Sequence, residues 1–490
     1  MRVLTLVHRW LGILFCLLFA MWFASGIVMH FVPFPSLTEA ERIDGLAAVE
    51  PPEGLRRSAE AAGAIKDATR VRLLQRVDRP VYLVSGSFGV KALGAADLSD
   101  AAVRSEELAL AIAVDHARRR KIDVTQAAFA EFLTVDQWTL SGALNRHRPL
   151  YRVSLNDEAS TDLYVSSATG EVVSDTTRRE RAWNYVGSVA HWIYPTALSS
   201  RAAIWNMAVW SLSLAALITV LAGSLLGILK VKLAWGGIAS PYQGWHKWHH
   251  LLGLACMVFV VSWIFSGWLS LDSGRLFSTG ELSPEDAASI SSAPAWNDLS
   301  KAEWRPSSGD SAKEVEWISF DGKFYRRERT GLDAQRLFVV GEGAGASAAP
   351  QAFLGGHEID HFVERLAPNC NAPIVIAADD NHAISSSIPN APVYRSVCSE
   401  VWYHIDGASG AILERSDPSS RAYRWLYSAL HRLDIPSLNA RPMLRSALIV
   451  LLCGCGLIFS LTGAVIGWRR LRLTRPRSGS NSPDPEGRTG

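Results

Sequence analysis

Hydrophobic residues are concentrated in four long stretches that contain no Asp, Glu, Lys or Arg. These stretches lie between Arg9 and Glu39, Arg201 and Lys230, Lys247 and Asp272, and Arg445 and Arg469. A helix rises about 1.5 Å per residue, so each stretch is long enough to cross the hydrocarbon core of a bilayer. The pattern therefore predicts four transmembrane helices.

Basic residues predict how these helices are oriented. Lys and Arg occur in three segments that flank the helices. The start of the chain carries Arg2 and Arg9, the short loop between the second and third helices carries Lys230, Lys232 and Lys247, and the segment after the fourth helix carries Arg469, Arg470 and Arg472. Such clusters face the cytoplasm in membrane proteins. We therefore expect a multi-pass membrane protein with both termini in the cytoplasm and two large polar regions facing outward.

These expectations divide the chain into eight segments. The polar regions are each about 170 residues long, which is enough for a folded domain. The last segment is rich in Pro, Ser, Gly and charge and is predicted to be disordered. The segments are transmembrane helices at 1–33, 201–230, 248–271 and 445–469, outer domains at 34–200 and 272–444, a cytoplasmic loop at 231–247, and a basic tail at 470–490.

The chain resembles itself at an offset of about 240 residues. His8-Arg9-Trp10-Leu11-Gly12 matches His249-His250-Leu251-Leu252-Gly253, and Ser25-Gly26 matches Ser266-Gly267. The segment from Trp183 to His191 matches the one from Tyr423 to His431. A fixed offset of this kind predicts two tandem repeats, each a helix, an outer domain and a second helix, related by a pseudo-twofold axis along the membrane normal.

Each outer domain is predicted to be α+β. Residues 104–120 and 357–366 have helical periodicity, and alternating strand-like runs follow in the first copy at 151–155 and 163–165. A turn at Ala168-Thr169-Gly170 then leads to a further strand-like run. This succession of a helix and a hairpin resembles the PepSY module.

Histidines supply the candidate chemistry. Ionisable residues at membrane depth are costly and usually functional, and neutral imidazole binds iron. The offset pairs His8 with His249 near the cytoplasmic ends of two helices, and His191 with His431 just outside the other two. Two such pairs suit one or two six-coordinate haems, each held by one histidine from each repeat. His30 is an alternative outer ligand, and anchoring of these residues at lipid headgroups is the competing interpretation.

Two further features lie in the second outer domain. His357-Glu358-Ile359-Asp360-His361 has the H-E-x-x-H spacing of zinc peptidases, but the first copy has no equivalent. We therefore expect at most weak binding of a metal or ferric complex by His357, His361 and His382. Cys370 and Cys398 are the only cysteines predicted to lie outside the membrane helices, and they are expected to form a disulfide in an oxidising compartment.

The motif that opens the first helix, the paired PepSY-like domains and the His191 and His431 segments together resemble the PepSY-associated transmembrane helix family. The resemblance covers Met1 to about Arg472. It implies a protein of the bacterial inner membrane, with its large domains in the periplasm, that binds b-type haem and reduces a ferric siderophore at the periplasmic face during iron acquisition. Electrons would come from an unidentified cytoplasmic or quinol donor. No residue is assigned as a catalytic acid or base, because outer-sphere electron transfer requires none.

Two other functions are compatible with the same architecture. PepSY units resemble parts of protease propeptides, so the outer domains could instead bind and inhibit a periplasmic peptidase without any haem. A transport accessory for the siderophore is the other, although few polar groups lie within the four predicted helices. The absence of a basic stripe or a nucleic-acid-binding motif argues against nucleic acid as a partner.

Overall fold

The computed structural model describes 1–86, 89–234, 237–271, 276–278, 280, 282, 296, 304, 311–340, 350–367 and 369–473. Most of the predicted disordered tail, from 474 onward, lies outside the described residues.

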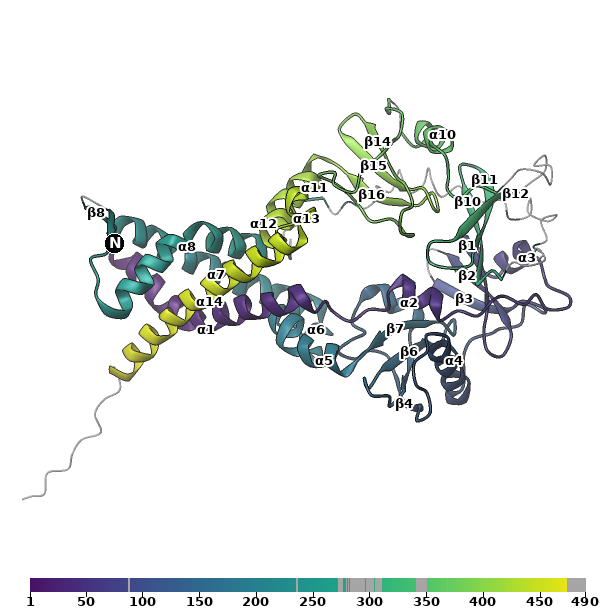
Figure 1. Cartoon of the computed structure of the whole chain (residues 1–490), viewed down its shortest axis with the longest axis horizontal. Coiled ribbons are helices and arrows are strands. Elements are labelled where there is room, and N and C mark those ends of the chain that lie inside the picture. The colour runs from purple at the N-terminus through teal and green to yellow at the C-terminus, as the bar shows by residue number, and fades with distance from the viewer. Residues whose placement is uncertain are drawn as a thin grey trace, which may run out of the picture.

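Four long apolar helices form one bundle, which confirms the four predicted spans (Figure 1). Aromatic and aliphatic side chains fill its centre, among them Phe15, Phe19, Phe23, Leu217 and Trp263. The outward surface is equally apolar, as expected for helices that contact lipid. The helices are α1 (Arg2–Phe31), α7 (Ala202–Lys230), α8 (Gly244–Leu269) and α14 (Pro442–Leu473).

The start of the chain and the outer region lie at opposite ends of this bundle (Figure 1). α1 begins at Arg2, α7 ends at Lys230 and α14 ends beyond Arg472, so the basic termini of these helices gather at the end marked N in Figure 1. The β-sheets all lie beyond the other end, apart from the short hairpin of β8 (Lys232–Ala234) and β9 (Gly237–Ala239).

Each half of the chain contains a four-stranded antiparallel sheet with one long helix, which confirms the predicted α+β character. In the first half, α4 (Glu106–Arg119) packs against the sheet through Ala109, Ile112 and Ala113. In the second half, α10 (Gly356–Leu366) uses Ile359 and Phe362 in the same way. The strands are β4 (Ala128–Leu133), β5 (Leu150–Ser154), β6 (Asp162–Ser166) and β7 (Val172–Thr176), then β13 (Ile374–Val375), β14 (Val393–Cys398), β15 (Val401–Asp406) and β16 (Ile412–Ser416).

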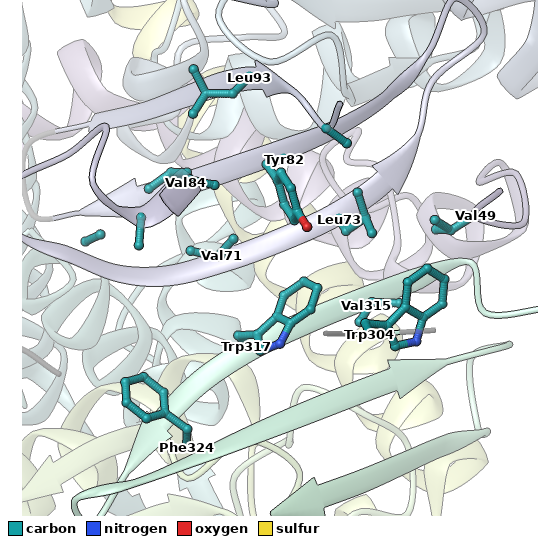
Figure 2. Close-up of a cluster of buried hydrophobic side chains, with 14 of the residues drawn as sticks. Val49, Val71, Leu73, Tyr82, Val84, Leu93, Trp304, Val315, Trp317 and Phe324 are labelled. Atoms are coloured by element: carbon teal, nitrogen blue, oxygen red, sulfur yellow. The ribbon is translucent and has the colours of Figure 1, made fainter. Parts of the chain in front are cut away.

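A third sheet joins the two halves, which the sequence analysis did not anticipate. Its six strands have the order β12-β11-β10-β1-β2-β3, and the antiparallel pair β1–β10 is the junction. Figure 2 shows the apolar face of this sheet, where Tyr82 and Trp317 lie among aliphatic side chains from both halves. The strands are β1 (Ala68–Gln75), β2 (Pro80–Gly86), β3 (Gly89–Gly94), β10 (Glu314–Phe320), β11 (Lys323–Arg329) and β12 (Gln335–Val340).

Short helices connect the sheets to the bundle. They are α2 (Glu39–Asp44) and α3 (Ser58–Ala62) before the shared sheet, a 3-10 turn at Gly142–His147, then α5 (Arg178–Asn184) and α6 (Thr196–Ser199) in the first half, and α11 (Pro418–Tyr423), α12 (Leu430–Arg432) and α13 (Pro436–Asn439) in the second.

The other face of the shared sheet carries a buried cluster of charges. Glu314 is fully buried and lies 2.9 Å from Arg42, 3.2 Å from Arg72 and 3.2 Å from Arg329. Burial alone raises the pKa of a carboxyl, but Arg42 and Arg72 more than offset it and hold the pKa of Glu314 well below its ordinary value. Arg72 also makes a two-pronged ion pair with Glu171. The cluster thus joins α2 and the four-stranded sheet of the first half to the second half of the chain.

We expect Glu314→Gln to destabilise the outer region by about 3–5 kcal/mol, because it leaves three buried guanidinium groups without a shared carboxylate. The thermal unfolding midpoint of the detergent-solubilised protein measures this effect. Glu60→Gln is the matched control, since Glu60 pairs with Arg56 and Arg57 at the surface and its loss should cost at most about 1 kcal/mol. Equal midpoints for the two variants would contradict the assigned role of the cluster.

Candidate functional site

The outer histidines follow the same unusual backbone in both halves. A π-helical turn spans Tyr185–Val189 before His191, and another spans Arg424–Ala429 before His431. Such turns are rare and often mark functional sites. Each histidine is followed two positions later by a non-glycine residue in the left-handed conformation, Ile193 at φ 50° and Leu433 at φ 49°. These local features aim both imidazoles into the bundle.

The two outer histidines face each other. The ring centres of His191 and His431 are 6.2 Å apart. His191 Nδ1 is 2.9 Å from the hydroxyl of Ser25, and His431 Nδ1 is 3.1 Å from the hydroxyl of Ser266. Trp22 fixes the backbone at this point by donating its indole N–H to the carbonyl of His191. The serines occupy matching positions in α1 and α8.

The inner histidines form a second pair with nearly the same ring separation, although their rings are inclined at 34° rather than 67°. The ring centres of His8 and His249 are 6.3 Å apart. His8 Nδ1 is 3.1 Å from the carbonyl oxygen of Thr219 on α7, and His249 Nδ1 is 2.9 Å from the hydroxyl of Thr462 on α14. Phe459 stacks on the ring of His249 at 4.7 Å. All four helices of the bundle therefore contribute to holding this pair.

All four imidazoles leave Nε2 without a hydrogen bond in the part of the chain that the structure describes. This arrangement is typical of metal-bound histidine, in which the second ring nitrogen is held by a polar partner. A metal–imidazole bond is about 2 Å, so two bonds plus the two ring radii place ring centres about 6 Å apart. Both measured separations match that value, so the residues fit a bis-histidine metal group such as haem.

The outer pair lies outside the four spans, and burial keeps it uncharged. Burial lowers the pKa of His191 to about 3, with a further contribution from His431. Burial also lowers the pKa of His431 to about 4. Both rings are therefore neutral near pH 7, which is the protonation state that binds iron.

Glycines make room for the rings. A Cβ atom at Gly223 would lie 2.7 Å from His8 Nδ1, and one at Gly267 would lie 3.2 Å from His431 Cε1. The counterparts Gly463 and Gly26 would meet His249 and His191 at 3.4 and 3.8 Å. The matched glycines of the two halves thus adjoin the matched histidines.

His30 does not take part in either pair. Its Nε2 lies 2.8 Å from the hydroxyl of Ser446, so it links the outer ends of α1 and α14. Two other histidines of α8, His250 and His246, also lie outside the two pairs. His250 is buried with both ring nitrogens in hydrogen bonds, to Ser240 and to the carbonyl of Gly227, whereas His246 is exposed.

The expected weak metal site in the second outer domain is not assembled. Within the described residues, no group of three or more His, Cys, Asp or Glu side chains could hold a metal ion. His357 and His361 are exposed on α10, and His361 pairs with Asp321. His382 lies elsewhere, against Trp402. The H-E-x-x-H spacing has a structural cause, because Glu358 accepts a hydrogen bond from the backbone N–H of Gly355 and caps the helix.

A disulfide joins Cys370 to Cys398 in the second outer domain. It ties the chain after α10 to the end of β14. The free cysteines Cys16, Cys256, Cys453 and Cys455 all lie in the spans.

Sequence reasoning missed the groups that hold the histidines. The matched dipeptides Ser25-Gly26 and Ser266-Gly267 were visible as part of the offset, and they are the hydroxyl and the glycine beside each outer ring. The inner partners had no such signal. Thr219 contributes only its backbone carbonyl, and Thr462 its hydroxyl.

The fold and these contacts define a four-span membrane protein whose helix bundle presents two facing histidine pairs. The chain belongs to the family described as PepSY-associated TM region, whose profile matches residues 5–470 and so nearly the whole sequence. The family resemblance seen in the sequence is thereby confirmed. Comparison with curated proteins finds no significant match.

We expect Gly223→Ala to displace the ring of His8 and to destabilise the bundle by about 1–3 kcal/mol, because the added methyl group overlaps the imidazole. The unfolding midpoint in detergent measures the change. Gly454→Ala serves as the control, since a Cβ atom there meets nothing within 4 Å. A midpoint for Gly223→Ala at or above that of Gly454→Ala would contradict the packing described for His8.

Proposed function

We propose that this chain is a haem-dependent electron-transfer protein of the bacterial inner membrane that reduces a ferric siderophore at the periplasmic face. One observation carries the proposal: two facing histidine pairs at opposite ends of one bundle, each with Nδ1 fixed and Nε2 free. Membership of the PepSY-associated family supports it.

His8 and His249 would hold one b-type haem, and His191 and His431 a second. Each haem, when bound, would supply a one-electron Fe(III)/Fe(II) couple, and two axial imidazoles favour electron transfer over oxygen binding. The hydroxyl and carbonyl partners of Nδ1 orient the rings and fix which nitrogen faces the metal. With two imidazoles per haem, the protein itself would supply the ligands to the iron.

The bundle places the two pairs at the two sides of the membrane. Along α1, His8 and the outer-pair partner Ser25 are seventeen residues apart, or about 25 Å. Between them lie Phe15, Phe19 and Phe23, which exclude water from the path. Electrons can therefore cross the low-dielectric layer in two shorter stages rather than one.

Orientation and substrate follow from charge and chemistry. The basic ends of the helices gather at the inner pair, and the positive-inside rule supports a cytoplasmic location for that end and a periplasmic one for the sheets. A cytoplasmic or quinol donor would supply electrons there. The ferric chelate is the substrate on the outer side, and its reduction to Fe(II) weakens binding by hard oxygen ligands.

The two halves contain the same succession of elements, in which a long helix, a four-stranded sheet with one helix and a π-helical turn precede a second long helix. This supports a tandem duplication with a pseudo-twofold axis along the membrane normal. Each proposed haem then lies between the halves and takes one ligand from each.

We expect the purified protein to contain two b-type haems per chain and each of His8→Ala, His249→Ala, His191→Ala and His431→Ala to lose one of them. Pyridine haemochrome quantitation per chain measures this. His246→Ala and His30→Ala are the controls and should keep both haems, since His246 is exposed and His30 bonds to Ser446. Loss of haem from His30→Ala but not from His191→Ala would reassign the outer site.

We expect the double variant Ser25→Ala/Ser266→Ala to hold the outer haem about 10–100-fold more weakly, because His191 loses the hydroxyl at its Nδ1 and His431 keeps only the carbonyl oxygen of Trp263, 3.2 Å from its Nδ1. Haem transfer to excess apomyoglobin measures the loss, and the inner haem should remain. Ser262→Ala is a suitable control, since the Ser262 hydroxyl bonds only within its own helix, to the carbonyl of Phe259. Unchanged transfer from the double variant would show that these hydroxyl groups do not support haem.

A further inference from the structure

The two halves differ at one place close to the outer histidine pair. In the first half, Arg181 donates hydrogen bonds to the carbonyls of Thr176 and Ser160 and pairs with Asp162 at 3.2 Å. In the second half, Arg421 donates to the carbonyls of Ser416 and Glu400, the aligned positions. The aligned partner of Asp162, however, is Trp402.

This change removes a negative charge and adds an aromatic face. The guanidinium of Arg421 lies over the ring of Trp402 at 4.2 Å, and within the described residues it pairs with no carboxylate. Arg395 lies over the same ring at 4.9 Å, although its own charge is paired with Asp380. A guanidinium over a tryptophan face is a stable arrangement that leaves the positive charge uncompensated.

A second substitution enlarges the same surface. The position aligned with Trp138, which is buried against Phe34 and Tyr185, is occupied by His382. His382 contacts Trp402 edge-on at 5.2 Å and Trp425 at 6.3 Å, and its ring makes no hydrogen bond in the described part of the chain.

Arginines outnumber their paired carboxylates around His382, because Arg395 and Arg424 have acidic partners and Arg421 has none within the described residues. Burial lowers the pKa of His382 to about 4, and Arg424 and Arg395 lower it further, against a smaller opposing effect of Asp380. Two other carboxylates lie nearby. Asp434 is 3.8 Å from Arg424, and Glu414 is partly buried with a pKa raised by burial. Within the described residues, neither forms an ion pair with Arg421.

The surface adjoins the outer histidine pair. Trp425 is 40% exposed and lies in the π-helical turn that leads to His431. Tyr427 in the same turn stacks on the ring of His431 at 5.6 Å. His431 follows Trp425 by six positions, which corresponds to about 9 Å along a helix. A ligand on Trp425 is therefore within short reach of the electron-donating end of the bundle.

The geometry points to a binding site for an anionic ferric chelate with aromatic ligand groups, of the catecholate class, formed by Trp402, Trp425, His382, Arg421 and Arg424. The exposed ring of Trp425 and the edge of His382 are available to contact aromatic rings, and Trp402 holds the guanidinium of Arg421, whose charge complements the negative complex. The inference rests on the proposed function for the redox role of the site, but binding itself requires no haem.

Gallium(III) complexes test binding without reduction, because Ga(III) has no accessible lower state under these conditions. Equilibrium dialysis of the full-length protein in detergent, with gallium tris-catecholate and with neutral gallium tris-acetohydroxamate, gives the two dissociation constants. We expect the catecholate complex to bind at least about 10-fold more tightly.

Trp402→Asp is the decisive variant, since it recreates the Asp162–Arg181 pair of the first half and so preserves a partner for Arg421. It should weaken catecholate binding about 10-fold or more. Trp183→Leu, which removes an exposed tryptophan of the first half, should leave binding unchanged.

Equal binding of the two complexes, or unchanged catecholate binding by Trp402→Asp, would overturn the site. Haem content measured on the same preparations separates the two proposals. A haem-free protein that binds gallium catecholate would refute the electron-transfer function alone, whereas a haem-loaded protein that does not bind it would refute this site alone.

Discussion

The structure depends on how four imidazoles, buried in or beside an apolar bundle, satisfy the hydrogen-bonding needs of their ring nitrogens. Leaving polar groups unpaired in such surroundings is costly. Each Nδ1 is held by a serine, a threonine or a carbonyl on another element, which fixes the ring and leaves Nε2 without a hydrogen bond in the described part of the chain. The glycines beside the rings and the π-helical turns before two of them follow from the same requirement.

The outer region is built around a second constraint, the burial of charge at the junction of the two halves. Arg72 and Glu314 lie on strands from different halves, and their shared sheet keeps the two PepSY-like units at fixed positions over the bundle. Because a buried ion pair is costly to break, this junction favours a rigid frame. In the proposed function such rigidity would keep a chelate bound to one unit close to the outer histidines.

Much of this organisation could be predicted from the sequence. Charge-free stretches identified the spans, and the offset of about 240 residues matched His8 with His249 and His191 with His431 before any contact was known. The shared sheet could not be predicted, because pairing of β1 with β10 joins residues about 245 positions apart and leaves no local pattern. The H-E-x-x-H spacing was misleading, since a helix-capping glutamate between two exposed histidines produces the same letters.

The central claim is that the paired histidines are axial ligands of haem. The most direct measurement is the reduced-minus-oxidised visible spectrum of the protein purified from haem-replete cells, recorded with and without carbon monoxide. The account predicts sharp b-type α-bands that carbon monoxide does not change, because both axial positions are already filled by imidazole. A colourless protein, or a reduced spectrum shifted by carbon monoxide, would contradict it.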